Sequence, residues 1–329
     1  MQESKLETST AGRLGFGLSS IAGLAFRKEQ QRILQTAYDC GISHFDTAPY
    51  YGSGDAESIL GEFLRDRTIK ATITTKYGLQ SGALHLGGAY FRNIARRAFR
   101  IMPFLKPGIG RTLGALSPTT RNHSIEGMVQ SVDSSLQKLR LERIDFFLLH
   151  DWSAEKALET DVLGALENLV ALGKIGIGGF ASSAEEVQYV LNAQASVFGA
   201  FQFRHSLTSS GNNLLRNHSS YRLFTHGTFS EAFNLLKKIL KIRPGLSERL
   251  RQQLGIDLQD ERELARMLMC WALNENRMGT ILFSTRSPER IAENARMAIS
   301  PRFDSEVVGK FDRLFRSVMT SSLTFTKTL

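Results

Sequence analysis

Short apolar runs alternate along the chain with longer segments whose apolar residues recur at helical spacing. The apolar runs predict strands at residues 13–18, 43–47, 71–76, 144–150, 175–180, 198–203, 221–226 and 280–284. The segments between them predict helices, among them residues 28–40, 55–65, 124–139, 161–172, 183–193, 260–274 and 287–298. Strands that alternate with helices in this way indicate a parallel sheet.

Eight such units with no linker between them predict a single (β/α)8 TIM barrel over residues 1–329, although this length exceeds the roughly 250 residues typical of that fold. The excess is concentrated after the third strand, in Gly78–His123, and in Phe229–Asp257, and we expect both stretches to be loops. Two predicted helices start on plausible caps, because Ser183 and Ser287 each precede acidic residues that suit the first turn of a helix.

The composition is that of an ordinary globular protein. Hydrophobic residues make up 42% of the chain and charged residues 22%, which argues against disorder and against a membrane protein. Residues 1–12 lack the basic and apolar regions of a secretory signal, so we expect a cytoplasmic protein. Cys40 and Cys270 are too few for a disulfide framework or a thiolate metal site.

The formal net charge of +9 favours anionic partners. Nucleic acid, a membrane surface, and a phosphorylated ligand or cofactor all satisfy that preference, and net charge does not choose among them. The choice depends on local motifs.

Four polar residues fall where a barrel places its chemistry, at the carboxyl ends of strands and in the loops that follow. They are Asp46, Tyr51, Lys76 and His150. Each has an ordinary structural explanation when taken alone, since polar residues normally resume where strands end. Their agreement at the ends of three consecutive strands favours an active site.

Together these four residues suggest proton transfer to a carbonyl oxygen, with a tyrosine as the acid. The unperturbed pKa of tyrosine is about 10, so we expect Lys76 to lower the pKa of Tyr51 and Asp46 to hold the lysine charged. His150 would polarise the substrate oxygen. Neither a nucleophile elbow nor a metal-ligand spacing competes, so we expect no metal and infer that a nicotinamide cofactor supplies a hydride.

These motifs resemble those of a known family, the aldo/keto reductases, which are NADPH-dependent (β/α)8-barrel oxidoreductases. Gly41–Gly61 looks like the family's D-T-A-x-x-Y-G segment, and Asp145–His150 looks like its D-x-x-x-x-H strand. The resemblance covers nearly the whole chain and implies the same catalytic tetrad. Tyr50 is the alternative phenol, but its spacing from Asp46 is less suitable than that of Tyr51.

A second stretch, residues 284–294, is similar to the family's cofactor phosphate and adenine site. The resemblance implies that the cofactor contacts Ser284, Thr285, Arg286, Arg290, Glu293 and Asn294. Hydroxyls, arginines and a helix N-terminus are suited to holding a phosphate, and the two arginines favour NADP(H) over NAD(H). The alternative explanation is a solvated helix start.

Gly176–Ala181 fits a loose dinucleotide-binding fingerprint, but no acidic residue occurs between Glu186 and Glu231 to bind a ribose. We therefore reject that interpretation. In the family this strand ends in a Ser-Asn pair that holds the nicotinamide carboxamide, whereas Phe180 and Ala181 stand there in this chain. Ser182 and Ser183 are candidate substitutes.

Two further positions concern the nicotinamide pocket. Gln202 looks like the family's other carboxamide contact. The region where the family has an aromatic residue that stacks on the nicotinamide holds Thr225–Gly227 instead, so the resemblance supports the tetrad more firmly than this pocket.

The insert at residues 78–123 carries Arg92, Arg96, Arg97, Arg100, Lys106, Arg111 and Arg121. These charges are explained most simply as a solvated face. The sharper hypothesis is a basic roof over the active site that selects an anionic substrate. The insert and the lysine-rich stretch Leu235–Arg243 also raise the alternative of a membrane-surface role.

We therefore expect an NADP(H)-dependent carbonyl reductase or sugar dehydrogenase, with a small carbonyl or sugar substrate and no nucleic-acid partner. The altered nicotinamide pocket leaves open a second function: a low-turnover NADP(H)-binding regulatory or interaction protein with the same barrel.

Overall fold

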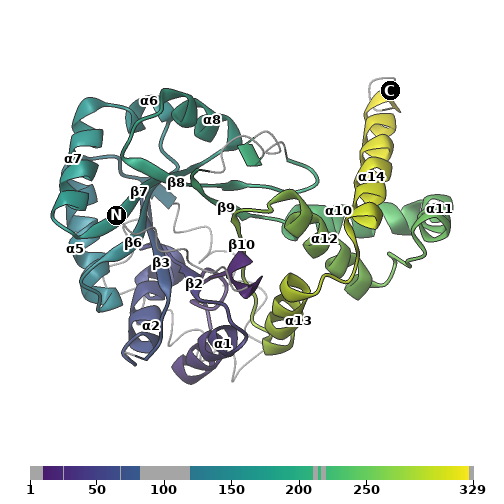
Figure 1. Cartoon of the computed structure of the whole chain (residues 1–329), viewed down its shortest axis with the longest axis horizontal. Helices are drawn as coiled ribbons and strands as arrows, with labels where there is room; N and C mark the ends of the chain where they lie inside the picture. The colour runs from purple at the N-terminus through teal and green to yellow at the C-terminus, as the bar shows by residue number, and fades with distance from the viewer. Residues whose placement is uncertain are drawn as a thin grey trace, which may run out of the picture.

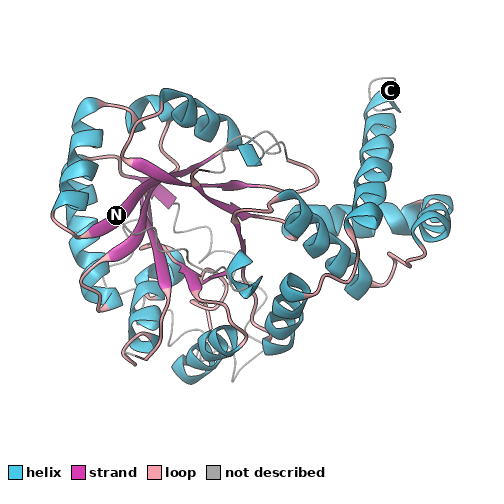
Figure 2. Ribbon diagram, viewed as in Figure 1, coloured by secondary structure: helices cyan, strands magenta, loops and turns pink. Residues whose placement is uncertain are grey.

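Eight parallel strands close into a barrel in the order β1-β10-β9-β8-β7-β6-β3-β2, with helices around it (Figure 2). The computed structural model describes residues 10–325 except 25, 67, 82–118, 210–213 and 216–219. The barrel strands are β1 (Leu14–Gly17), β2 (His44–Asp46), β3 (Thr72–Tyr77), β6 (Ile144–His150), β7 (Ile175–Ser182), β8 (Phe198–Arg204), β9 (Arg222–His226) and β10 (Thr280–Phe283). The predicted (β/α)8 barrel is confirmed.

The surrounding helices follow the predicted pattern. They are α1 (Arg27–Asp39), α2 (Ala56–Phe63), α5 (Ile125–Leu139), α6 (Ala154–Ala157), α7 (Thr160–Ala171), α8 (Ala184–Ala193), α12 (Glu261–Glu275) and α13 (Pro288–Ile299), with short 3-10 helices η1 (Thr10–Arg13) and η2 (Tyr51–Gly54). Both predicted caps are confirmed, because the Ser183 and Ser287 side chains accept hydrogen bonds from the backbone N–H groups of Glu186 and Arg290.

The expectation that Phe229–Asp257 is a loop is wrong. The stretch forms α10 (Ser230–Ile242) and α11 (Pro244–Leu254), which bury Leu236, Leu240 and Leu250. Leucines four residues apart cover one helix face, Pro244 occupies the first turn of α11, and the left-handed Gly255 ends it.

An additional helix, α14 (Ser305–Phe325), was not among the predicted elements. It packs on α11 and α12, and with α10 and α11 it lies to one side of the barrel, where the chain ends (Figure 1). The leucine face of α10 is thus directed into this helical group, and Lys237 pairs with Glu261 of α12. Within the described residues, no helix is long and apolar enough to cross a membrane.

The insert after β3 begins and ends in a small antiparallel sheet made of β4 (Leu79–Ser81) and β5 (Thr119–Arg121). Arg121 on β5 pairs with Asp151, the residue after β6, at 2.6 Å. The interior of the insert lies outside the described residues, and with it the other basic residues of the expected roof, so that expectation stays a prediction.

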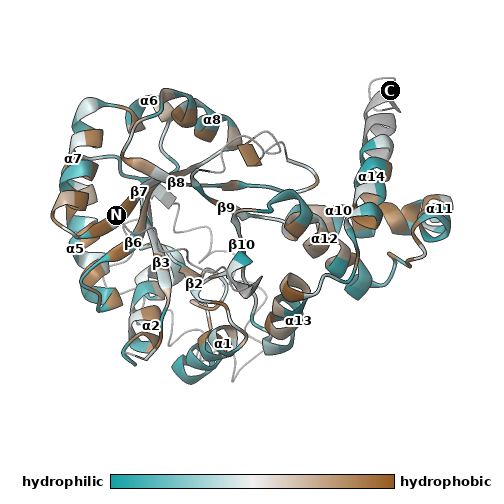
Figure 3. Ribbon diagram, in the orientation of Figure 1, coloured by the Kyte–Doolittle hydropathy of each residue, from teal (hydrophilic) through white to brown (hydrophobic). Residues whose placement is uncertain are grey.

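Apolar side chains pack in two layers. The inner layer fills the barrel with Leu148, Ala181, Ala200, Phe224 and Leu282. The larger layer lies between strands and helices; Figure 3 shows hydrophobic residues along β7 and a mixture of hydrophobic and hydrophilic residues on the outer helices. The filled interior confines polar chemistry to the ends of the strands.

His44 is a polar residue that is buried among the apolar side chains inside the barrel. Its Nδ1 and Nε2 atoms hydrogen-bond the hydroxyls of Thr72 and Thr74 at 2.9 and 3.3 Å, and its ring stacks on Phe224 with centroids 4.7 Å apart. Burial, and then the nearby charge of Lys76, lower the pKa of His44 to about 3. The imidazole is therefore neutral in the folded protein.

This burial predicts a loss of stability in acid. A histidine in the unfolded chain binds a proton below pH about 6.5, whereas His44 in the folded protein does so only near pH 3. The contribution of His44 to the free energy of unfolding is therefore complete above pH 6.5 and is lost as the pH falls toward 3. Between pH 7.5 and pH 5 the free energy of unfolding should fall by roughly 2 kcal/mol from this group. In urea titrations at the two pH values, the free energy of unfolding of His44→Gln should fall by about that much less than that of the wild type. Equal falls in the two proteins would contradict a neutral, buried His44.

Candidate active site

A buried ion pair joins the ends of two adjacent strands. The Nζ of Lys76 lies 2.6 and 2.7 Å from the two carboxylate oxygens of Asp46 and 3.0 Å from the backbone oxygen of Thr47. Lys76 is 1% exposed and Asp46 3% exposed, so neither charge is solvated by bulk water. Burial raises the pKa of Asp46, while the Lys76 ammonium and a hydrogen bond from the Gln202 amide oppose the rise.

The turn after β2 brings Tyr51 to this pair. The ring of Tyr51 lies with its centroid 5.1 Å from the Lys76 Nζ. Gly52 has φ of 58°, and a Cβ there would meet the Ala22 Cβ at 2.3 Å, so both backbone and space require glycine. The glycine that follows Tyr51 thus fixes the path of the loop.

The expectation that Lys76 lowers the pKa of Tyr51 is wrong. Burial, and next the Asp46 carboxylate, raise the pKa of Tyr51, and a hydrogen bond with Tyr50 opposes the rise. Both oxygens of Asp46 contact the Lys76 ammonium, so the pair presents little net positive charge to the phenol. Tyr51 therefore stays protonated at neutral pH, which is the state that a proton donor requires.

His150 ends β6 beside the two tyrosines, with its ring centroid 5.6 Å from that of Tyr50. Burial, and next Lys76 and His226, lower the pKa of His150 to about 3, so the ring is neutral. Its Nδ1 is buried with no hydrogen-bond partner among the described residues. Gly78 allows β3 to end beside this strand, because a Cβ there would meet the His150 backbone oxygen at 2.0 Å.

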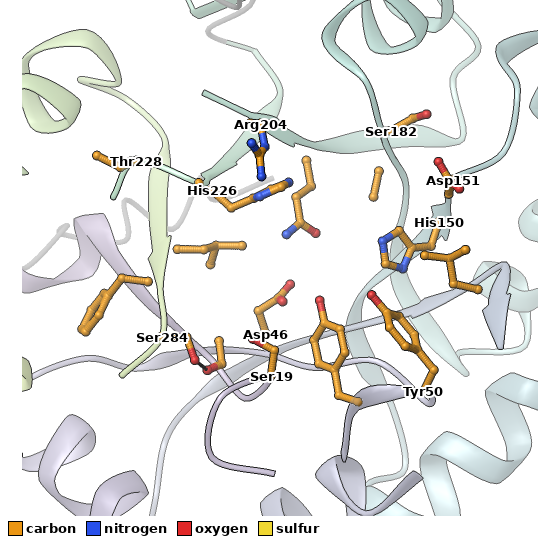
Figure 4. A pocket seen from close by; sticks show the side chains of 18 of the residues that line it. Ser19, Asp46, Tyr50, His150, Asp151, Ser182, Arg204, His226, Thr228 and Ser284 are labelled. Atoms are coloured by element: carbon orange, nitrogen blue, oxygen red, sulfur yellow. Dashed lines mark hydrogen bonds between the residues drawn. The ribbon is translucent and has the colours of Figure 1, made fainter. Parts of the chain in front are cut away.

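These side chains surround one cavity of about 730 Å³ at the carboxyl ends of the strands. Figure 4 shows Asp46, Tyr50 and His150 along one side, and Arg204, His226 and Thr228 across from them. The structure therefore brings the four predicted catalytic residues together, since Lys76 lies directly behind Asp46. The arrangement combines a buried charge pair, a protonated phenol and a neutral imidazole.

The fold and this geometry agree with what sequence comparison finds. A model of the aldo/keto reductase family matches residues 13–225. The chain belongs to the aldo/keto reductase family. The family predicted from the two motifs is thus confirmed.

Two curated relatives show how this chain compares with other proteins. It is 32% identical over 149 residues to the pyridoxal 4-dehydrogenase of Microbacterium luteolum, covering 43% of this chain and 40% of the relative. It is 30% identical over 187 residues to the D-threo-aldose 1-dehydrogenase of a Pseudomonas species, covering 52% and 51%. The matched part of the chain spans about half or less of the length of these relatives.

Solved structures share the fold over most of the chain. The glycerol dehydrogenase of Gluconobacter oxydans superposes with a TM-score of 0.66 at 17% identity, covering 92% of this chain and 90% of the other. An aldo-keto reductase from Klebsiella pneumoniae in complex with NADPH gives a TM-score of 0.62 at 20% identity, with the same coverage. At such identities these likenesses show the aldo/keto reductase fold.

The predicted cofactor segment begins at the rim of the cavity. Ser284 lines the cavity, donates to the Gly17 backbone oxygen at 2.6 Å, and contacts the Ser20 hydroxyl. Arg286 donates to the Ser20 backbone oxygen at 2.9 Å, which ties the loop after β1 to the start of α13. The first turn of α13 follows, with Arg290 exposed.

The remaining predicted cofactor residues differ in their surroundings. The hydroxyl of Thr285 accepts a hydrogen bond from the Ser287 backbone N–H at 3.2 Å. Glu293 accepts from Arg266 at 2.8 Å, and Asn294 is half-buried on the same helix. Gln202 lies apart from this segment, inside the cavity, where its Oε1 is buried with no partner among the described residues.

The end of β7, where the resemblance implies a carboxamide-binding pair, offers few free polar groups. Ala181 lines the cavity but offers no polar group, and Phe180 is fully buried against Phe198. The two candidate substitutes are engaged elsewhere: the hydroxyl of Ser182 donates to the Trp152 backbone oxygen at 3.3 Å, and that of Ser183 caps α8. Of the residues considered as carboxamide contacts, Gln202 has a buried acceptor, its Oε1, with no hydrogen-bond partner among the described residues.

The glycines rejected as a dinucleotide fingerprint lie within β7. A Cβ on Gly178 would meet the Val197 backbone oxygen at 2.9 Å, and one on Gly179 would meet the Leu148 side chain at 2.3 Å. These glycines therefore permit close packing between strands and do not form a phosphate-binding turn.

Sequence reasoning did not propose Arg204 and His226 as site residues. They end β8 and β9, pair in register, and face the cavity; Arg204 also forms an ion pair with Glu231 of α10. Burial, and next Lys76 and Arg204, lower the pKa of His226 to about 4. The rule that strand ends carry site residues, which identified Lys76 and His150, would have found both.

The buried ion pair should couple strongly in stability measurements. Lys76→Met leaves an unpaired buried carboxylate and should lower the free energy of unfolding by about 3–5 kcal/mol. Asp46→Asn should cost a similar amount, and the double variant should cost clearly less than the sum of the two. Urea titrations of the four proteins give this coupling, and additive losses would contradict a paired, desolvated site.

Proposed function

We propose that this protein is an NADP(H)-dependent oxidoreductase that reduces an aldehyde or ketone, or oxidises the corresponding alcohol or sugar. The observation that carries the proposal is that Asp46, Tyr51 and His150 line one cavity, with Lys76 at the end of β3 bound to Asp46 directly behind its wall. Membership of the aldo/keto reductase family supports the reaction class.

In this proposal each of the four residues has a distinct role. Tyr51 donates a proton to the substrate oxygen during reduction and takes it back during oxidation. Lys76, held by Asp46, lies 5.1 Å from the Tyr51 ring and provides a cation behind the phenolate that forms. Neutral His150 hydrogen-bonds the substrate oxygen and orients the carbonyl without adding a charge to the cavity.

NADP(H), when bound, supplies or accepts the hydride. The described residues fit such a group: the buried, unpartnered Oε1 of Gln202 can accept a hydrogen bond from a carboxamide N–H. Ser284 and Thr285 present hydroxyls at the rim, Arg286 and Arg290 add positive charge at the N-terminus of α13, and Glu293 and Asn294 follow one turn later. That combination suits a phosphate-bearing ribose.

The substrate we propose is a small carbonyl compound or sugar. The names of three relatives, a pyridoxal 4-dehydrogenase, an aryl-alcohol dehydrogenase [NADP(+)] and a D-threo-aldose 1-dehydrogenase, support this class. The hypothesis of an anionic substrate depends on arginines outside the described residues and stays a prediction.

One observation favours a second candidate function. The usual carboxamide-binding pair is absent, and the hydroxyls of Ser182 and Ser183 are engaged elsewhere. A barrel that binds NADP(H) but turns over slowly, as a regulatory or interaction protein, is consistent with that loss of contacts. Turnover separates the two candidates.

Removal of the proposed acid tests the leading function. Tyr51→Phe should lower kcat for NADPH-dependent reduction by about 10²-fold or more, because a positioned acid contributes roughly that much. Absorbance at 340 nm follows the reaction with pyridoxal, D-threo-aldoses and aryl aldehydes. Wild-type turnover that persists in Tyr51→Phe would contradict the assigned acid, and NADPH binding without wild-type turnover would favour the second candidate.

The two arginines at α13 give a separate test of the cofactor. Arg286→Ala with Arg290→Ala should raise the Kd for NADPH about tenfold or more and leave the Kd for NADH nearly unchanged, because only NADPH carries the extra phosphate. Arg296→Ala is the matched control, since Arg296 is exposed on the same helix and its Nε donates to the Ala292 backbone oxygen. Equal weakening of both cofactors would contradict the assigned phosphate site.

A further inference from the structure

Arg204 brings a positive charge into the cavity. It ends β8, lines the cavity, and lies across from Tyr50 and His150 in Figure 4. Among the described residues that line the cavity, Arg204 is the one that is positively charged at neutral pH, because burial lowers the pKa values of His150 and His226 to about 3 and about 4. The roles proposed for the catalytic and cofactor residues leave this arginine without a function.

Strand register places Arg204 one layer above the level of the proposed chemistry. Gln202 lies level with His150, through Ala181 on the strand between them. Arg204 follows Gln202 by two residues, so its side chain leaves the same face of β8 about 6–7 Å nearer the open end of the barrel. The backbones of His150 and Arg204 are then about 10–12 Å apart, and both side chains extend into that interval. A substrate whose carbonyl lies beside His150 can therefore reach Arg204 with a group a few atoms away from that carbonyl.

Gly227 leaves room for the Arg204 side chain beside β9. It has φ of 85°, and a Cβ there would meet the Arg204 Cγ at 3.1 Å and its Nε at 3.4 Å. The left-handed backbone and the close contact both favour glycine. The stem of the arginine therefore packs along the backbone that follows β9, which restricts where its guanidinium can lie.

Glu231 holds the guanidinium at the cavity without using all of its donors. The Nη1 of Arg204 pairs with Glu231 in the first turn of α10. The two side chains are 42% and 64% exposed, and ion pairs this exposed contribute little because water screens them. A guanidinium carries N–H donors on three nitrogens, so one ion pair leaves others for a ligand.

The two carboxylates among the described lining residues have cations of their own. Asp46 is held by Lys76, and Asp151 pairs with Arg121 at 2.6 Å. An anion that enters the cavity therefore meets the Arg204 guanidinium beside carboxylates that are already paired. Arginine binds carboxylates and phosphates through two parallel hydrogen bonds, which are about twice as strong as neutral ones.

We propose that Arg204 is a substrate-binding residue whose guanidinium binds a carboxylate or phosphate group of the substrate, so that the enzyme prefers carbonyl compounds that carry such a group. This inference rests on the proposed function and names its substrate class. It is independent of the predicted basic roof, because Arg204 lies on a barrel strand. The bound group takes no part in the reaction, so Arg204 acts on substrate affinity and not on the chemical step.

Two pairs of substrates test the proposal, because the members of each pair share an aldehyde and differ in one anionic group. They are 4-carboxybenzaldehyde with methyl 4-formylbenzoate, and D-glyceraldehyde 3-phosphate with D-glyceraldehyde. For wild type, Arg204→Gln, Arg204→Lys and Glu231→Gln, kcat and KM are measured for NADPH-dependent reduction. Arg222→Gln is the matched control, since Arg222 is exposed at the other end of the same pair of strands.

Arg204→Gln should raise KM for the anionic substrates about tenfold or more, while kcat and the KM for the neutral partners stay near their wild-type values. Arg204→Lys should restore part of the affinity, because it restores the charge without the planar fork. Glu231→Gln should act in the opposite direction and lower KM for the anionic substrates about two- to fivefold, because an exposed ion pair no longer competes for the guanidinium. Arg222→Gln should behave like the wild type.

Equal changes in KM for anionic and neutral substrates in Arg204→Gln would overturn the proposal. Changes of the same sign in Arg204→Gln and Glu231→Gln would also overturn it, and would leave the ion pair as a structural contact between β8 and α10. Thermal unfolding of each variant confirms that the barrel is still folded.

The diphosphate of the cofactor offers the same chemistry as an anionic substrate, so fluorescence titrations give the Kd for NADPH and for NADH in each variant. Both values should stay close to those of the wild type in Arg204→Gln. A rise in both values would assign Arg204 to the cofactor diphosphate and overturn its assignment to the substrate.

A binding measurement separates failure of this inference from failure of the proposed function. A wild type that reduces none of these aldehydes contradicts the function. Calorimetry with the NADP+ complex then compares the binding of 4-methylbenzoate with that of neutral 4-methylbenzamide. A preference for the carboxylate that Arg204→Gln removes supports the anion site, and the absence of such a preference overturns it.

Discussion

The buried ion pair between Lys76 and Asp46 is the interaction on which the rest of the site depends. Two charges removed from water are costly unless each finds close partners, and here the ammonium contacts both carboxylate oxygens and the Thr47 backbone oxygen. The pair can form only because β2 and β3 are neighbours in register, with Asp46 opposite Thr74. It places a cation 5.1 Å from the Tyr51 ring while adding almost no net charge to the cavity.

Around this pair the barrel assembles groups that stay neutral. Strand register places His150 opposite Ala181 and Ala181 opposite Gln202. The neighbouring strands β6, β7 and β8 therefore each contribute one of these residues to the same wall of the cavity. Burial keeps the imidazole of His150 uncharged and Tyr51 protonated.

The opposite half of the cavity matches the family motifs less well than the half that holds the four candidate catalytic residues. Ala181 stands where a polar contact is usual, and Arg204 and His226 face the same space from the ends of β8 and β9. The Arg204–Glu231 pair connects this half to α10, a helix that was expected to be a loop. Charged and titratable side chains therefore line the cavity at positions that the family motifs do not specify.

The sequence by itself determined the barrel, most helices and the four candidate catalytic positions, because apolar periodicity and strand ends are local signals and Asp46 and Tyr51 lie close together in the sequence. It did not determine that α14 would form and pack with α11, nor that Tyr51 would resist ionisation. Those outcomes depend on which residues are brought together: the same lysine would lower the pKa of Tyr51 in water-exposed isolation, but tertiary packing commits its charge to Asp46 and buries the phenol. Burial and partner choice are properties of the folded chain, so only the tertiary structure decides the electrostatics of the site.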